Sequence, residues 1–310
     1  MKPITISLNP TYLCNFRCKF CYLTPEQLAD KTKLDPKRLK EILEELRSAG
    51  YLFEHVDFYG GEIGLLSLDY LRELDEVLFD FNDDASINIV TNLYKVHPFF
   101  LEDHVTLSVS YDFEAREKSA EVLANILKTN KPISILMLAS PKVLSKDVEE
   151  MIKFFNSIAN VVSVEIKPYS SNQANQLFVT NIDFENFVYK WLTAKTKKNF
   201  SFINENNIKR SLLGEYNAFS DNHIYITPTG KIATLEFDEN DNEFFLEFDK
   251  FEEYLKWTEQ EKKKIFNNSF CNKCEYQGHC LTEHYRNVTS LEDSCNGYKR
   301  LLDESQLLFS

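Results

Sequence analysis

Three cysteines lie close together near the start of the chain, at positions 14, 18 and 21. Thiolates are soft ligands that suit zinc, copper(I) and iron–sulfur clusters. A 4Fe–4S cube takes a ligand on each of its irons, so three neighbouring cysteines would leave one iron open. An open iron can bind a small chelating ligand, much as a catalytic zinc ion keeps one position free. The spacing of Cys14, Cys18 and Cys21 therefore indicates a reactive metal centre.

The alternative for this triplet is a structural zinc site, or three unrelated buried cysteines. A structural zinc site takes four ligands, usually cysteine or histidine. Residues 22–34 contain neither, which favours the open cluster.

Four more cysteines form a quartet near the other end of the chain, at Cys271, Cys274, Cys280 and Cys295. Four thiolates saturate a 4Fe–4S cluster and fit tetrahedral zinc equally well, so spacing alone leaves both open. An odd total of seven cysteines is awkward for a disulfide framework and natural for three plus four metal ligands.

The bulk composition restricts the partners that we expect. The chain has 310 residues, a formal net charge of −13 and 43% hydrophobic residues. Such an acidic chain lacks the basic surface that non-specific binding to nucleic acid needs. We find no signal peptide and no apolar run long enough to span a membrane, and therefore expect a cytoplasmic protein in a reducing compartment.

Short apolar, β-branched runs alternate with helical patterns over the first half of the chain. We expect strands at residues 4–8, 56–59, 87–90, 105–110, 133–138 and 161–166. Helices are expected between them, the first after Asp35, which precedes Pro36 and has the features of an N-cap. This alternation predicts an α/β fold with a parallel sheet, shaped as a partial (β/α)6 TIM-like barrel.

Residues whose side chains could bind a ligand or take part in catalysis follow most of these strands. Ligands bind such sheets at the carboxyl ends of the strands. We therefore expect one site that gathers the cysteine triplet, Gly60-Gly61-Glu62, Thr91-Asn92, Ser110 and Lys167.

The pattern changes in the second half of the chain. Residues 224–227 and 231–234 flank a turn signal at Pro228-Thr229-Gly230 and predict a hairpin. We place a boundary near residue 200. It separates a barrel domain at 1–200 from a small α+β extension at 201–310 that holds the quartet.

The triplet, with an aromatic residue just before its third cysteine, resembles the signature of the radical S-adenosylmethionine (SAM) superfamily. In that family the open iron is chelated by the amino and carboxylate groups of SAM. The reduced cluster then cleaves SAM to a 5′-deoxyadenosyl radical, which abstracts hydrogen from a substrate. Gly60-Gly61-Glu62 resembles the superfamily segment that binds the SAM amino group.

The resemblance implies further SAM contacts. Thr91-Asn92 is similar to the Thr-Asn-Gly of many relatives, with Leu93 in place of glycine. Ser110 and Asp112 match a Ser-x-Asp after the fourth strand, and Arg116 is the candidate clamp for the SAM carboxylate. The expected set is completed by Phe20 and Tyr22, flanking the adenine, and by Lys167. Ordinary turn or core packing is the alternative for each.

The quartet resembles the C-terminal SPASM/twitch extension of radical SAM peptide maturases, which carries auxiliary clusters. Leu235 and His284 stand where the full extension has cysteines. The resemblance therefore implies a reduced extension with one auxiliary 4Fe–4S cluster. Glu236 occupies the place of a catalytic base in some relatives; a solvated strand carboxylate is the alternative.

Together these features predict a radical SAM enzyme that modifies a ribosomally synthesised peptide by crosslinking, epimerisation or oxidation. The peptide would enter between the βα loops and the 224–248 segment, past Tyr225 and Leu235. A small-molecule substrate such as a sugar, amino acid or nucleotide is the first alternative. A non-catalytic electron-transfer protein is the second, although it has no need of an open iron. Because the chain starts in the first barrel strand, we expect a separate leader-recognition protein or direct leader contact, and a flavodoxin or ferredoxin-type reductant.

Overall fold

The computed structural model describes residues 1–169, 177–219, 221–235, 245–282, 288–291 and 295–309. Ten strands in these residues form one sheet, in the order β10-β9-β8-β1-β2-β3-β4-β5-β6-β7. The strands are β1 (Lys2–Leu8), β2 (Tyr51–Phe58), β3 (Ser86–Thr91), β4 (Val105–Ser110), β5 (Ile133–Leu138), β6 (Val161–Lys167), β7 (Ser201–Phe202), β8 (His223–Ile226), β9 (Ile232–Leu235) and β10 (Phe245–Phe248).

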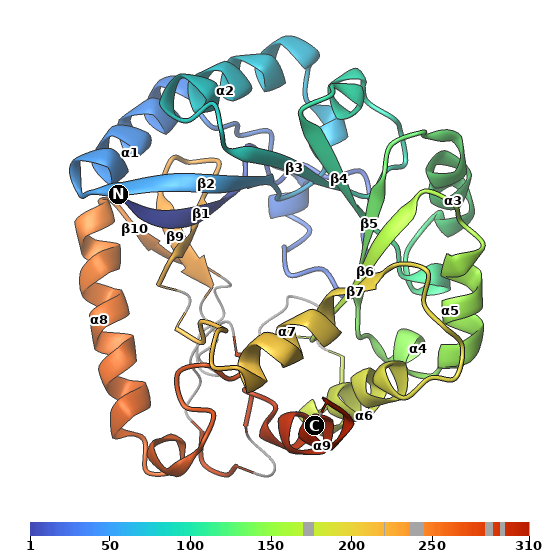
Figure 1. Cartoon of the computed structure of the whole chain (residues 1–310). Helices are drawn as coiled ribbons and strands as arrows, with labels where there is room; N and C mark the ends of the chain where they lie inside the picture. Colours follow the sequence, from blue (N-terminus) through green and yellow to red (C-terminus); the bar gives the residue numbers. More distant parts are fainter. Residues whose placement is uncertain (170–176, 220, 236–244, 283–287, 292–294, 310) are drawn as a thin grey trace.

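Strands β1 to β7 are parallel to their neighbours, as a chain of βα units requires. Figure 1 shows them curving around the middle of the molecule, with helices on the outer side. The predicted α/β partial barrel is confirmed. Its helices are α1 (Pro36–Ser48), α2 (Leu68–Phe81), α3 (Ser119–Lys128), α4 (Pro141–Leu144), α5 (Val148–Asn156), α6 (Asn181–Leu192), α7 (Ile203–Leu212), α8 (Phe251–Asn267) and α9 (Lys299–Phe309).

Side-chain alternation divides each barrel strand between two environments. Ile4, Ile6 and Leu8 of β1 are fully buried in one apolar core shared with Leu39 and Ile42 of α1. Each such side chain contributes about 1.5–3 kcal/mol through burial. The intervening residues of β1 face the inside of the barrel. The expected cap of α1 is present, because the Asp35 side chain accepts a hydrogen bond from the Lys37 backbone at 2.9 Å.

The predicted hairpin is present as β8 and β9, which pair antiparallel. Its relation to the barrel was not predicted: β8 also pairs in parallel with β1, from Thr5↔His223 to Leu8↔Ile226. The C-terminal strands therefore extend the barrel sheet past its first strand. The domain boundary near residue 200 stays a prediction, and hydrogen bonding of the sheet runs on across it.

One helix starts later than its periodicity suggests. The helical pattern that starts near residue 115 becomes a regular helix, α3, only at Ser119, after the short 3₁₀ turn η4 (Phe113–Ala115). Phe113 and Lys118 adopt left-handed backbone angles, with φ of 52° and 51°, which interrupt a continuous helix. The resulting turn brings Arg116 back onto Asp112.

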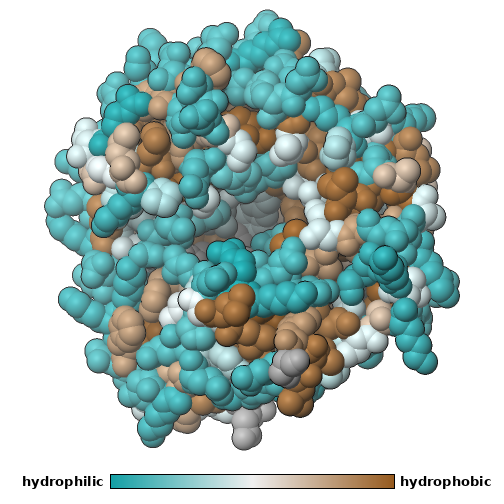
Figure 2. Space-filling model, in the orientation of Figure 1, coloured by the Kyte–Doolittle hydropathy of each residue, from teal (hydrophilic) through white to brown (hydrophobic). Residues whose placement is uncertain are grey.

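No helix within the described residues is both long and apolar enough to cross a bilayer. Figure 2 shows a mainly hydrophilic face that is hollowed at its centre, where Figure 1 shows the inside of the barrel.

Candidate active site

The cysteine triplet lies on the loop between β1 and α1, at the carboxyl edge of the sheet. Loops from three other strands reach it there. Asn92, after β3, donates its side-chain amide to Asn15 Oδ1 at 2.9 Å. Arg116, after β4, approaches Cys18 Sγ at 3.6 Å. Of the residues expected at this edge, the structure thus places Asn92 against the cysteine loop.

Gly60 and Gly61 allow the chain after β2 to press against the cysteine loop. A Cβ atom on Gly61 would lie 2.2 Å from the Leu13 carbonyl oxygen and 2.4 Å from that of Tyr12. A Cβ on Gly60 would lie 2.5 Å from the Thr11 oxygen, and its φ of +117° also disfavours other residues. Both glycines are therefore required by close backbone contact with the loop that carries Cys14.

Glu62 is a buried carboxylate that ties three loops together. Its Oε1 accepts hydrogen bonds from Thr91 Oγ1 at 2.7 Å and from the Gly64 backbone at 2.9 Å. Its Oε2 accepts from the Asn92 backbone at 2.7 Å. Burial raises the pKa of Glu62, and these donors oppose that rise. A carboxylate offers about four lone-pair sites, so Oε2 retains one for the predicted SAM ammonium.

We expect Glu62→Gln to lower the free energy of unfolding by about 1–3 kcal/mol, because its amide would place N–H groups against existing donors. SAM affinity should fall about tenfold while the visible absorbance of the cluster remains. Glu54→Gln, an exposed glutamate on β2, is the matched control. Unchanged SAM affinity, measured by equilibrium binding, would contradict the assigned role.

Arg116 is held beside the triplet by a fully buried partner. Its Nε and Nη2 lie 2.7 and 2.6 Å from Asp112 Oδ2, and Asp112 Oδ1 accepts from the Leu138 backbone. The guanidinium also stacks over the Phe20 ring, 5.1 Å from its centroid. Two of its five N–H groups remain for a carboxylate, so the predicted SAM clamp stays compatible with this geometry.

Burial of the triplet disfavours the ionised, thiolate form of its cysteines in the protein alone. It raises the pKa of Cys14 to about 12 and also raises that of Cys18, where Arg116 opposes the shift. A bound metal supplies the positive charge that deprotonates such thiols. The donor set of one buried and two half-buried thiols beside one cation therefore fits an iron–sulfur cluster.

The remaining expected SAM residues surround this edge. Phe20 is buried beneath Arg116. Tyr22 stacks on Tyr59 at 6.0 Å and donates to the Gly60 carbonyl at 3.4 Å. Ser110 ends β4, and Lys167 ends β6 with an ion pair to Glu165 at 2.9 Å. Their roles toward SAM stay predictions.

The quartet lines a small cavity of about 40 Å³ beyond the end of α8. Zinc binds sulfur at about 2.3 Å, which places tetrahedral ligands about 3.8 Å apart. Among the residues that the structure describes, only Asp75, Glu102 and His104 bring three such ligand atoms within 4.8 Å of one another. Four thiols around one cavity fit a 4Fe–4S cluster or a zinc ion.

Gly297 gives the quartet its close packing. A Cβ there would lie 2.8 Å from Cys280 Sγ and 2.9 Å from Cys280 Cβ. We expect Gly297→Ala to displace Cys280 and to lower the iron content of the reconstituted protein by about four per chain. SAM cleavage at the triplet should persist, which is the internal control. Full iron content in this variant would show that Cys280 is not a ligand.

Comparison with known families identifies the barrel. The family model described as the radical SAM superfamily matches residues 8–155, which include the triplet, Glu62 and Arg116. Residues 8–155 form a radical SAM domain. The resemblance drawn from the cysteine spacing, and with it the enzyme class, is thereby confirmed for this domain.

Solved structures extend the likeness beyond the radical SAM domain. Native anSMEcpe with bound AdoMet is 14% identical with a TM-score of 0.69, and the match covers 99% of this chain and 98% of that one. SuiB from Streptococcus suis bound to S-adenosylmethionine is 16% identical with a TM-score of 0.65, over 90% and 72%. SuiB bound to precursor peptide SuiA is 15% identical with a TM-score of 0.64, over 93% and 75%. At such identities these matches show a shared fold.

Among curated proteins, an uncharacterised protein from Archaeoglobus fulgidus is 27% identical over 113 residues, which is 36% of this chain and 26% of that protein. The matched part spans about a quarter of that relative's length.

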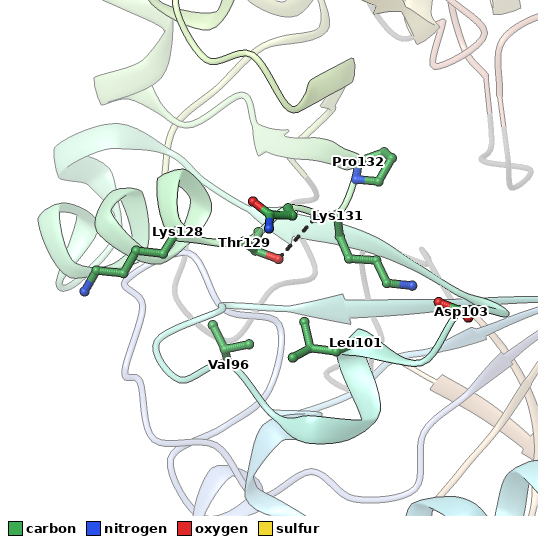
Figure 3. A pocket seen from close by; sticks show the side chains of 8 residues that line it. Val96, Leu101, Asp103, Lys128, Thr129, Lys131 and Pro132 are labelled. Carbon is green, nitrogen blue, oxygen red and sulfur yellow. Dashed lines mark hydrogen bonds between the residues drawn. The ribbon is translucent and has the colours of Figure 1, made fainter.

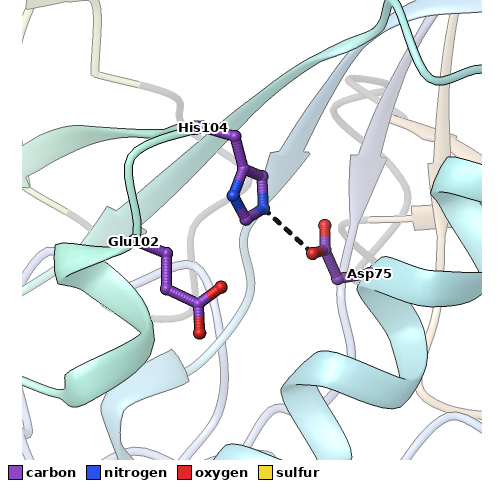
Figure 4. A group of neighbouring side chains, drawn as sticks. All are labelled: Asp75, Glu102 and His104. Atoms are coloured by element: carbon purple, nitrogen blue, oxygen red, sulfur yellow. Dashed lines mark hydrogen bonds and ion pairs between the residues drawn. The ribbon is translucent and has the colours of Figure 1, made fainter.

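Two features lie at the opposite, amino-terminal edge of the sheet from the radical SAM cysteines. A surface pocket of about 500 Å³ lies between the segments that precede β4 and β5 (Figure 3), where Lys131 donates to the Glu102 and Val105 carbonyls. Near it, His104 pairs with Asp75 at 2.9 Å (Figure 4), and Glu102 pairs with Arg72 at 2.9 Å. These pairings account for the grouping of Asp75, Glu102 and His104.

Some residues were missed by the sequence analysis, and others cannot be placed. Asn15 and Tyr59 touch the site but stood in no recognised pattern. A signal was available for Tyr59, because it continues the inward-facing alternation of β2. Glu236, the candidate base, and His284 lie outside the described residues.

Proposed function

We propose that this protein is a radical SAM enzyme that modifies a ribosomally synthesised peptide, with one SAM-binding cluster and one auxiliary 4Fe–4S cluster. The main support for this proposal is the arrangement of residues at the carboxyl edge of the sheet. There, the three thiols of the triplet, one buried and two half-buried, share an edge with an anchored carboxylate, Glu62, and with Arg116, which contacts Cys18 Sγ at 3.6 Å.

The residues divide the work of binding SAM between them. Cys14, Cys18 and Cys21 would hold the first cluster. Together with SAM, this cluster would supply the radical that abstracts hydrogen from the substrate. Glu62 Oε2 would accept from the SAM ammonium, and Arg116 would donate to its carboxylate. Tyr22 and Tyr59 provide stacked aromatic surface beside them.

Cys271, Cys274, Cys280 and Cys295 would hold the auxiliary cluster. Four thiolates leave no vacant position, so this cluster would support folding or electron flow rather than SAM binding. We expect about eight iron and eight sulfide per chain after anaerobic reconstitution. Stoichiometric zinc with about four iron would show instead that the quartet binds zinc.

A peptide substrate is supported by the whole-chain fold, which SuiB shares in a structure bound to its precursor peptide SuiA. We expect residues 224–235 and 245–248 to form one side of an access path. There, the ring of Tyr225 on β8, the strand beside β1, lies 5.2 Å from the ring of Phe245 on β10, between centroids. A leader-recognition protein and a flavodoxin or ferredoxin-type reductant would complete the system.

The test is co-expression with each short reading frame beside the gene, followed by mass spectrometry of the peptide. We expect one peptide to change mass only when Cys18 is intact. If no peptide changes, and deoxyadenosine release rises instead with a sugar, amino acid or nucleotide, the enzyme acts on a small molecule and the peptide proposal fails.

A further inference from the structure

A band of polar side chains lines the inner face of the barrel, away from the cysteines. Register places them side by side across four strands: Thr5 pairs with His223 and His55, and Ser7 pairs with Asp57. Asp57 pairs in turn with Asn88 of β3. Neighbouring residues of β2, Val56 and Phe58, are fully buried on the helix-covered face. The chain has therefore placed histidines and a carboxylate where a closed barrel packs branched apolar residues.

Part of this inner face is open to solvent. The side chains of His55 and Asp57 remain 35% and 27% exposed, and those of Lys167 and Glu165, on β6, 39% and 18%. Figure 2 shows the corresponding hollow at the centre of the molecule. A concave space lined by a few fixed polar groups is where proteins bind small groups.

Asp57 is rigidly presented to this space. Its Oδ1 receives Asn88 Nδ2 at 2.6 Å and faces His55 Nε2 at 3.2 Å. Asn88 cannot turn away, because its Oδ1 accepts from Thr106 and Ser108. Within the described residues, Oδ2 of Asp57 accepts no hydrogen bond. Burial raises the pKa of Asp57, but the hydrogen bonds from His55 and Asn88 outweigh it and keep the carboxyl ionised.

Within the described residues, the nearby histidine and lysine side chains contact other groups. His223 is bound through both ring nitrogens, to Thr5 Oγ1 at 2.9 Å and to Ser7 Oγ at 3.1 Å. Lys167 pairs with Glu165, its neighbour on the same strand, at 2.9 Å. Oδ2 of Asp57 thus presents a fixed negative charge to the hollow.

An aromatic tier lies between Asp57 and the radical SAM cysteines. Tyr59 follows Asp57 on the same face of β2, about 6.6 Å further along the strand. Tyr22 stacks on Tyr59 at 6.0 Å and meets Phe245 edge-on at 5.9 Å, and Phe245 lies 5.2 Å from Tyr225. A group reaching from the cysteine edge to Asp57 therefore passes aromatic rings before it meets the carboxylate.

We infer that the barrel interior binds one basic side chain, lysine or arginine, of the substrate, with its cation on Asp57 Oδ2 and its aliphatic stem against the tyrosines. A long apolar stem with a terminal cation matches both tiers, and aromatic faces attract such cations. The net charge of −13 would favour the approach of a basic peptide. This inference rests on the proposed peptide substrate and names the side chain that its site selects.

The test measures binding without turnover, on the reconstituted holoenzyme with SAM and no reductant. The probes are acetyl-Gly-Lys-Gly-amide, its arginine analogue and acetyl-Gly-norleucine-Gly-amide, which keeps the stem and lacks the charge. We expect the lysine or arginine probe to bind about tenfold tighter than the norleucine probe. Asp57→Asn should remove that difference and Asp57→Glu should restore part of it. Asp69→Asn, which removes an exposed carboxylate on α2, should leave it unchanged.

Equal affinity for the charged and uncharged probes, or no measurable binding of either, would overturn the inference. So would an Asp57→Asn variant that keeps the preference. If Asp57→Asn does not fold, the comparison of probes on the natural protein still decides. Failure of the proposed function is separate: it appears as peptides that stay unmodified on co-expression while a small molecule drives deoxyadenosine release. Failure of this inference leaves peptide modification in place, without selection for charge.

Discussion

Alanine at Cys14, Cys18 or Cys21 is expected to abolish release of deoxyadenosine from SAM. In the proposed assignment each thiolate would ligate one iron of the first cluster, and an iron without its ligand makes the cube labile. The three sulfurs lie on one short loop held by Gly60, Gly61 and Glu62, so no other cysteine can replace them. Chromatography of anaerobic reactions with dithionite gives the readout, and iron content should fall by about four per chain.

Cys271→Ala is the matched control, because it removes a thiol from the quartet in the same protein. It should retain some uncoupled SAM cleavage while losing product formation or stability. A triplet variant that releases deoxyadenosine at the natural rate would refute the cluster assignment. Direct coordination of labelled SAM at the second cluster, detected by hyperfine spectroscopy, would contradict the division of roles.

Asp112→Ala should lower the free energy of unfolding by about 3–5 kcal/mol, because it leaves the guanidinium of Arg116 buried without its partner. The carboxylate is fully buried, while the side chain of Arg116 is 14% exposed. The variant also removes the acceptor of the Leu138 backbone N–H. Chemical denaturation under anaerobic conditions measures the change.

Asp103→Ala, in the exposed segment before β4, is the control and should change stability by less than about 0.5 kcal/mol. The double variant Asp112→Ala/Arg116→Met should recover part of the loss, since removing both charges of a buried pair costs less than removing one. A single Asp112→Ala variant as stable as the control would show that the pair does not fix Arg116.

Local pattern placed most of the barrel strands, although β2 begins at Tyr51, five residues before the expected strand at 56–59, and β7 was not predicted. Strands β4 and β5 lie at the predicted residues, because each is a short β-branched run with clear flanks. The Gly60-Gly61-Glu62 segment was predicted to meet the cysteine loop, since both follow neighbouring strands. Its donors could be foreseen only in part: Thr91 and Asn92 stood in the expected set, whereas the contact of Asn92 with Asn15 did not.

Long-range pairing was beyond local pattern. Nothing in residues 223–226 indicates that this strand pairs with β1 as well as with β9, its partner in the hairpin. The polar band around Asp57 could not be foreseen for the same reason, because His223 joins that band only through the pairing of β8 with β1. The polar residues His55 and Asp57 alternate with buried residues of β2 and were a visible signal. The pattern of one strand does not, however, indicate which residues of other strands lie beside it.

The most direct test of the central claim is transfer of deuterium from peptide to deoxyadenosine. The peptide identified by co-expression would be prepared with perdeuterated residues and incubated with the reconstituted enzyme, SAM and reductant. We predict that deoxyadenosine gains one deuterium in step with the change in peptide mass, and that Cys18→Ala abolishes both. Unlabelled deoxyadenosine beside an unmodified peptide, with release driven instead by a sugar, amino acid or nucleotide, would contradict the account.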